Sequence, residues 1–102
     1  DDLDIIVCDA SFISLKKILP ASLKFLKMTG YLIALIKPQF EIGKNLIGKG
    51  GVVKNPDHHD LVVRDIKNWL IKEIDFNVHG VTESPILGSK GNKEFLICAM
   101  KK

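Results

Sequence analysis

The segment GYLIALIKPQFEIG, from Gly30 to Gly43, decides the fold of this chain. Residues 31–36 form a short, strongly apolar run, which is typical of a β-strand buried in a parallel sheet. The run ends on Lys37, and Pro38 follows directly. Because proline restricts the residue before it to extended conformations, the direction of Lys37 is narrowed at the mouth of the strand. A lysine fixed at that place is a candidate functional residue.

Similar apolar runs occur elsewhere in the chain. They predict strands over residues 3–8, 31–36, 76–82 and 94–100. The run at 3–8 is almost wholly apolar, so we expect a strand buried on both faces, as in parallel sheets. The last two strands have no helical pattern between them and are expected to pair antiparallel.

Helical patterns separate these strands. Pro20 suits a first helical turn and Gly30 a stop, so we expect a helix over residues 20–28. Asn55 and Pro56 predict a second helix from residue 55 to about 73. Residues 11–19 are expected as a loop or single turn, and residues 38–54 and 83–92 as loops. The order strand, helix, strand, helix, strand, strand predicts a layered α/β sheet.

Length and composition limit the possibilities. The chain has 102 residues, which fits one small domain or half of a larger one, and 46% are hydrophobic, enough for a packed core. The net charge of +3 agrees with an anionic partner, although a solvated surface explains the scattered lysines equally well. Because the chain opens on DDLD and enters a strand at once, we expect residues 1–102 to be a single partial domain.

Cys8 and Cys98 both lie in apolar runs, which predicts reduced, buried thiols and a cytoplasmic protein. The longest apolar run, residues 31–36, is far too short to cross a bilayer. We therefore expect no membrane association.

Charged residues follow two of the predicted strands directly. Asp9 comes after the first strand and Lys37 after the second. In parallel sheets, ligands gather at the carboxyl ends of the strands, so neighbouring strands would bring these side chains together. The pair would then be either a catalytic constellation or a structural ion pair at the rim.

Two other motifs are weaker. The stretch GKNLIGKG at residues 43–50 nearly matches a phosphate-binding loop, but Gly50 replaces the hydroxyl residue and no helix is predicted after it. His58 and His59 lie beside two aspartates, but adjacent histidines point to different sides of a helix. We interpret both histidines as ordinary residues of a helix start and predict no metal site.

Four stretches carry a family resemblance: DASFISL, LIKPQFEIGK, GKGGVVKNPDHH and SPILGSKGNKEFL. In this order and spacing they resemble the TlyA or hemolysin A-type family, whose catalytic domain is FtsJ-like. The resemblance covers essentially the whole chain. It implies the C-terminal half of a Rossmann-like class I methyltransferase sheet with a terminal antiparallel hairpin. It also implies methylation of ribose 2′-hydroxyls in ribosomal RNA, with S-adenosylmethionine as cofactor and ribosomal RNA or ribosomal subunits as partners.

FtsJ-like enzymes carry a Lys-Asp-Lys-Glu tetrad, and three of its members have matches in this chain. Asp9 of CDASF matches the aspartate, Lys37 of IKPQFE the second lysine, and Glu94 of GNKEF the glutamate. The resemblance implies that these three are catalytic and that Asp9 also contacts the cofactor. The first lysine, the rest of the cofactor site and an RNA-binding domain belong upstream and have no match here, so we expect the chain alone to be inactive.

The implied chemistry explains a lysine at this position. A ribose hydroxyl is a poor nucleophile near neutral pH, and an amine placed against it can take its proton or stabilise the alkoxide. The two carboxylates would orient the ammonium and the hydroxyl.

The missing neighbour of the first strand has a consequence for assembly. In the family's sheet a cofactor-binding strand lies beside the strand at 3–8, and this chain has no match for it. We therefore expect either a homodimer through this exposed edge or upstream residues that cover it.

Three alternatives remain. The chain could be a non-catalytic remnant that binds RNA or protein. It could be membrane-lytic, as the hemolysin name implies, but no basic amphipathic helix or long apolar run supports this. It could also belong to an amino-directed methyltransferase, which would not need a lysine after the second strand.

Overall fold

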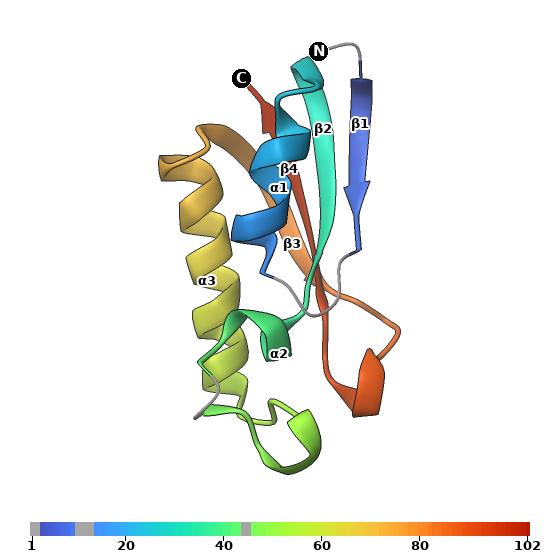
Figure 1. Ribbon diagram of the computed structural model, residues 1–102, viewed down its shortest axis with the longest axis vertical. Helices are drawn as coiled ribbons and strands as arrows, with labels where there is room; N and C mark the ends of the chain where they lie inside the picture. Colours follow the sequence, from blue (N-terminus) through green and yellow to red (C-terminus); the bar gives the residue numbers. More distant parts are fainter. Residues whose placement is uncertain (1–2, 10–13, 44–45) are drawn as a thin grey trace.

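The computed structural model describes residues 3–9, 14–43 and 46–102. It has a four-stranded sheet with helices packed on one face (Figure 1). The strands are β1 (Leu3–Cys8), β2 (Leu26–Ile36), β3 (Phe76–Glu83) and β4 (Phe95–Lys101). The helices are α1 (Leu15–Leu23), α2 (Pro38–Glu41) and α3 (Pro56–Lys72), with short 3₁₀ helices η2 (Lys49–Gly51) and η3 (Ser89–Gly91).

The strand order is β1-β2-β4-β3. β1 and β2 are parallel, with Cys8 beside Ala34. β4 lies between β2 and β3 and is antiparallel to both, so β2 and β3 run in the same direction. The predicted α/β class and the antiparallel pairing of the last two strands are therefore confirmed.

The core lies between the sheet and the two long helices. Alternate residues of β2 and β4 are buried on this face, and α1 and α3 each contribute apolar residues at helical spacing. The buried set comprises Leu26, Leu32, Ala34, Ile36, Phe76, Ile97 and Ala99 from the strands, Leu15, Leu19 and Leu23 from α1, and Val62, Ile66 and Leu70 from α3. This packing holds the carboxyl end of β2 in a defined place.

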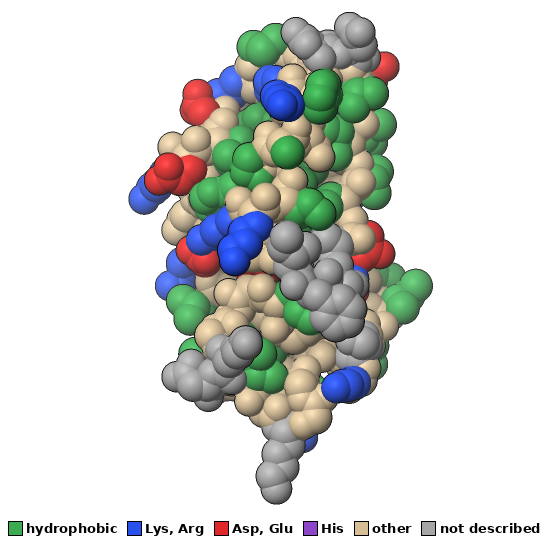
Figure 2. All heavy atoms as spheres, viewed as in Figure 1, with side chains coloured by type: hydrophobic (Ala, Val, Ile, Leu, Met, Phe, Trp, Pro, Cys, Tyr) green, Lys and Arg blue, Asp and Glu red, His purple; other side chains and the backbone are tan. Residues whose placement is uncertain are grey.

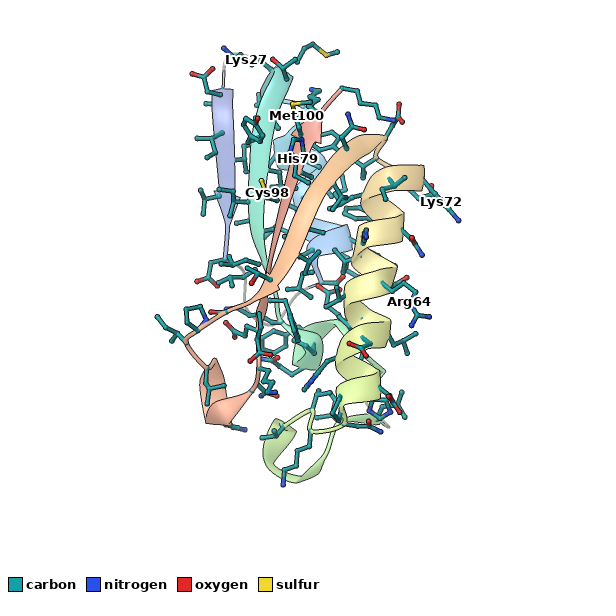
Figure 3. The ribbon with its side chains drawn as sticks, turned by 180° about the vertical axis from the view of Figure 1, so that it is seen from behind. Lys27, Arg64, Lys72, His79, Cys98 and Met100 are labelled. Atoms are coloured by element: carbon teal, nitrogen blue, oxygen red, sulfur yellow. The ribbon has the colours of Figure 1, made fainter. Side chains whose placement is uncertain are left out.

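The opposite face of the sheet is apolar, and within the described residues no helix covers it. In Figure 3, which shows the molecule from behind, His79 and Cys98 lie on this face. Tyr31 is exposed there, and its ring meets that of His79 edge to face, with centroids 5.7 Å apart. A shallow cavity of about 440 Å³ lies between Ile33, His79 and Cys98.

The prediction that the strand at 3–8 is buried on both faces is wrong. Leu3, Ile5 and Val7 are all exposed to solvent, and the exposed fraction of Val7 is 71%. The reason is position: β1 is at the sheet edge and is paired only with β2. Its composition matches an interior strand, but no described neighbour covers it.

The first helix is also displaced from its prediction. α1 is Leu15–Leu23, with Pro20 inside it, and not residues 20–28. Ser14 caps the helix by accepting a hydrogen bond from the Lys16 N–H at 3.1 Å. Burial of three leucines spaced four residues apart outweighs the cost of a proline in the middle. Of the predicted loop or single turn at 11–19, residues 11–13 lie outside the described residues, and residues 15–19 belong to α1, so the prediction is wrong there.

β2 begins at Leu26 and not at the predicted residue 31, and the added part of the strand contains an irregularity. The register to β1 shifts between Leu3 and Ile5, and Thr29 has a φ of 65°. Gly30, expected as a helix stop, lies inside the strand, where a Cβ would be 2.7 Å from the side chain of Leu26. The glycine is needed for close packing at this bulge.

The second long helix agrees with its prediction. Asn55 accepts a hydrogen bond from the Asp57 N–H at 2.9 Å, Pro56 is the first helical residue, and α3 ends at Lys72. The predicted loop at 38–54 is only partly a loop, because α2 and η2 lie in it. Cys8 and Cys98 are free thiols, as predicted, but they are half-buried and not fully buried. No helix within the described residues is long and apolar enough to cross a membrane.

Candidate active site at the carboxyl edge of the sheet

Asp9 and Lys37 lie at the same edge of the sheet and form an ion pair. The distance from Lys37 Nζ to Asp9 Oδ1 is 2.6 Å. The parallel pairing of β1 and β2 accounts for this contact, since the two residues directly follow the strands at their carboxyl ends. The side chain of Lys37 is only 12% exposed, whereas that of Asp9 is 59% exposed. The expected proximity is observed, and the lysine is the more enclosed partner.

Glu94 lies at the same end of the sheet. Ile36 and Phe95 are partners in the antiparallel register of β2 and β4, so Lys37 and Glu94 are the next residues beyond that pair. Glu94 is 7% exposed and is therefore buried. Its carboxylate packs directly on Gly88, where a Cβ would lie 1.9 Å from Oε2. The glycine leaves the space that this buried carboxylate occupies.

The thiol of Cys8 reports the local electrostatics. Burial raises its pKa, the charge of Asp9 raises it further, and Lys37 lowers it. The thiol is therefore kept protonated near neutral pH, and we assign it no nucleophilic role.

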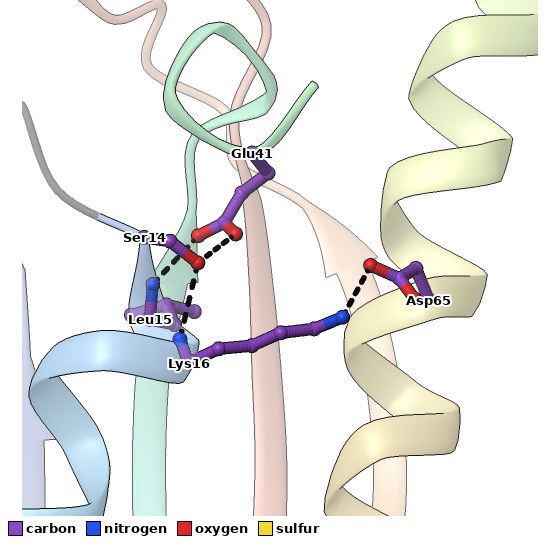
Figure 4. Close-up of polar contacts among 5 residues, drawn as sticks. All are labelled: Ser14, Leu15, Lys16, Glu41 and Asp65. Atoms are coloured by element: carbon purple, nitrogen blue, oxygen red, sulfur yellow. Dashed lines mark hydrogen bonds and ion pairs between the residues drawn. The ribbon is translucent and has the colours of Figure 1, made fainter. Parts of the chain in front are cut away.

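Two residues of the IKPQFE stretch have features that the sequence analysis did not assign. Gln39 is 7% exposed, and both its amide atoms are buried and have no hydrogen-bond partner in the part of the chain that the structure describes. Glu41 reaches from α2 to the start of α1, where both its oxygens accept hydrogen bonds (Figure 4). The motif drew attention to this stretch, but the partner of Glu41 is 27 residues away and no local signal indicates it.

A second set of contacts holds the loop before α3. Asn92, buried two residues before Glu94, accepts a hydrogen bond from the Val53 N–H at 2.9 Å and donates one to the Gly51 carbonyl at 3.0 Å. His59 Nε2 lies 2.6 Å from the Val53 carbonyl oxygen. His59 lies at the helix start, as interpreted, but its ring is buried and hydrogen-bonded, which the sequence analysis did not predict. The neighbouring His58 is half-buried in the first turn, as expected.

The helix-covered face carries charges of both signs. Figure 2 shows Lys and Arg side chains in several groups on this face, with Asp and Glu beside some of them. One such contact joins α1 to α3, where Lys16 Nζ lies 2.7 Å from Asp65 Oδ2. The mixture does not single out one nucleic-acid surface on this face.

Comparison with known proteins places these residues in a family context. A model of the FtsJ-like methyltransferase family matches residues 1–101. The chain is 37% identical over 95 residues to the 16S/23S rRNA (cytidine-2′-O)-methyltransferase TlyA of Mycobacterium tuberculosis, covering 93% of this chain and 35% of the relative. It is 41% identical over 96 residues to Hemolysin A of Brachyspira hyodysenteriae, covering 90% of this chain and 38% of the relative.

A solved structure shows the same fold. A candidate hemolysin from Lactococcus lactis superposes with a TM-score of 0.91 at 38% sequence identity, over 97% of this chain and 47% of that chain. The chain thus spans about a third of the length of the curated relatives, 35% and 38%, and about half of this structure.

Proposed function

Because this chain belongs to the FtsJ-like methyltransferase family, we propose that it supplies part of the active site of a ribosomal RNA ribose 2′-O-methyltransferase. The observation that supports this most is the Lys37–Asp9 ion pair at the carboxyl ends of two parallel strands. Glu94 lies at the same end of the sheet, directly before β4. These are the three residues that match the family's tetrad. Ribosomal RNA is then the substrate, and the protein works in the cytoplasm.

The chemistry assigned to this chain concerns the proton of the ribose hydroxyl. In this proposal Lys37 acts in one of two ways: as a neutral amine it takes that proton, or as an ammonium paired with Asp9 it stabilises the developing alkoxide. Asp9 orients the lysine through the 2.6 Å contact. Glu94, buried at the same end of the sheet, helps to orient the hydroxyl. A narrow range of lysine directions suits a transfer that needs close alignment of the reacting atoms.

S-adenosylmethionine is the methyl donor that this proposal requires, and when bound it would supply the electrophilic methyl group. The described residues fit only one end of such a site. Asp9 offers a half-exposed carboxylate that can accept hydrogen bonds, and Gln39 offers a buried amide with unpaired atoms. Four cavities of about 250 to 440 Å³ are lined by residues other than these two. Because Asp9 is accessible at 59% exposure whereas Gln39 is 7% exposed, we assign the contact to Asp9 alone.

The proposal is tested with the full-length protein and two matched RNA substrates, one unmodified and one already 2′-O-methylated at its cytidines. Methyl transfer to the first and not to the second supports ribose methylation. Equal transfer to both would indicate an amino-directed enzyme. RNA binding without any transfer would indicate the non-catalytic remnant.

A further inference from the structure

We propose that Glu41 is a positioning residue that holds Lys37 against Asp9 by fastening the two chain segments that follow them. This inference rests on the proposed function of Lys37. It starts from the observation that two sets of contacts, the ion pair and the bonds of Glu41, join the parts of the chain that follow β1 and β2. Lys37 is followed directly by α2, whereas residues 10–13, which lie outside the described residues, separate Asp9 from Ser14 at the start of α1.

The contact of Glu41 with α1 uses both carboxylate oxygens. The hydroxyl of Ser14 donates to Oε1 at 2.5 Å, and the backbone N–H of Leu15 donates to Oε2 at 2.8 Å (Figure 4). Hydrogen bonds to an ionised acceptor are stronger than neutral ones, and two of them fix direction as well as distance. α2 is a helix of only four residues that also packs against α3, and the bonds of Glu41 connect it to the start of α1.

The two contacts close a ring in the chain. Ser14 is five residues after Asp9, and Glu41 is four residues after Lys37. The Lys37–Asp9 pair closes the ring at one side and the Glu41 contacts close it at the other. Without Glu41, Lys37 would be followed by a segment held at fewer points, and its amine could move relative to Asp9.

Burial supports a specific role for this carboxylate. Glu41 is partly buried, which raises its pKa, while its bonds to Ser14 and Leu15 and the charge of Lys16 lower it and Asp65 raises it. Placing a charge there is costly unless its hydrogen bonds are made. The contact also caps the N-terminus of α1, so a purely structural role has to be separated from a positioning role.

The test compares three variants of the full-length protein. Glu41→Ala removes both hydrogen bonds. Glu41→Gln keeps the shape and can still accept from Leu15, so it serves as the conservative rescue. Asp65→Asn is the matched control, because it weakens the adjacent α1–α3 ion pair without touching the bonds of Glu41. Each variant is measured for kcat and KM of methyl transfer to ribosomal RNA.

A second readout is independent of methyl transfer. Reductive methylation with isotope-labelled formaldehyde, followed by mass spectrometry, measures how fast the Lys37 amine reacts relative to the other lysines. Its low exposure and its pairing with Asp9 protect it in the native protein. A loosened Lys37 reacts faster whether or not the protein is a methyltransferase, so failure of this inference and failure of the proposed function are distinguishable.

We expect Glu41→Ala to lower kcat by about tenfold or more with KM changed less than about twofold, because misplaced reacting groups cost rate and not binding. Labelling of Lys37 should rise several-fold. Glu41→Gln and Asp65→Asn should stay near the native values. Unchanged Lys37 labelling in Glu41→Ala, or an equal effect in Asp65→Asn, would overturn the proposal. If Glu41→Ala does not fold, Glu41→Asp, which keeps the charge but shortens the reach, takes its place with the same expected outcome.

Discussion

Lys37 and Asp9 contact each other through a 2.6 Å ion pair at the carboxyl ends of β2 and β1, with the lysine enclosed and the aspartate open to solvent. This asymmetry suits a lysine that acts on a bound group and an aspartate that orients it. It also means that the two side chains respond differently to substitution. An exposed carboxylate alone would stabilise the fold little, so effects on activity should exceed effects on stability.

Replacing Lys37 in the full-length protein should abolish methyl transfer while cofactor binding survives. Lys37→Ala removes the amine. Lys37→Arg keeps the positive charge, but its guanidinium group stays protonated at neutral pH and cannot act as a base. We expect both to lose at least about a hundredfold in kcat, the size of a general acid–base contribution. Methyl transfer to RNA and calorimetric titration of the cofactor check this, with His58→Ala as the silent control. Substantial activity in Lys37→Ala would show that its proposed role is wrong.

Neutralising either carboxylate should also cripple turnover. Asp9→Asn weakens the ion pair with Lys37, and Glu94→Gln replaces the buried carboxyl group directly before β4. Because orientation and not binding is affected, kcat should fall more than KM changes. Steady-state kinetics on RNA measure both. Normal kcat in Glu94→Gln would remove Glu94 from the catalytic set.

Gly88 should be intolerant of a side chain because of the carboxylate beside it. A Cβ at Gly88 would lie 1.9 Å from Glu94 Oε2, so Gly88→Ala must displace the buried Glu94. We expect a loss of about 1 to 3 kcal/mol in the free energy of unfolding, together with reduced activity. Gly80→Ala is the matched control, because a Cβ at this position would have no atom within 4 Å apart from those of the adjoining residues. Urea unfolding of both variants decides, and equal stability of the two would contradict the packing argument.

The pH dependence of stability should reveal Glu41. Burial raises its pKa above the ordinary 4.5, so the native state holds its proton more tightly than the unfolded state does. This contribution to stability is fully present below the unfolded pKa and is lost as pH rises through the folded pKa. Relative to Glu41→Gln, the native protein should therefore lose stability as pH increases above about 4.5. Urea unfolding of both proteins between acid and neutral pH measures their free energies of unfolding. A native protein whose stability relative to Glu41→Gln stays constant or increases with pH would refute the prediction.

The 102-residue chain by itself should neither methylate RNA nor bind S-adenosylmethionine with useful affinity, and it should self-associate through β1. The apolar edge of β1 is exposed, and such edges pair with other chains. Val7→Lys should favour the monomer, because a charge on an edge strand opposes pairing. Ile71→Lys, on an exposed position of α3, is the matched control. Light scattering and calorimetric titration check both points. A stable native monomer, or micromolar cofactor binding, would contradict this prediction.

Much of the fold follows from local signals in the sequence. Asn55 and Pro56 mark the start of α3, because capping and the fixed φ of proline act within one turn. The apolar runs mark all four strands, and the rule for parallel strands brings Asp9 and Lys37 together. The family motifs name Glu94 as well. These inferences succeed because each depends on neighbouring residues or on one general property of sheets.

Only the tertiary structure decided the features that depend on distant residues. Pro20 suggested a helix start. Burial of Leu15, Leu19 and Leu23 against the sheet outweighs that local preference, so α1 begins directly after Ser14. β1 has the composition of an interior strand but is exposed, because its burial depends on a neighbour that its own residues do not specify. The bonds of Glu41 to Ser14 and Leu15 join residues 27 and 26 positions apart, which only the tertiary fold brings within hydrogen-bond distance. Local backbone preferences amount to a few tenths of a kcal/mol up to about 3 kcal/mol per residue, whereas long-range burial and pairing sum over many contacts and prevail where the two conflict.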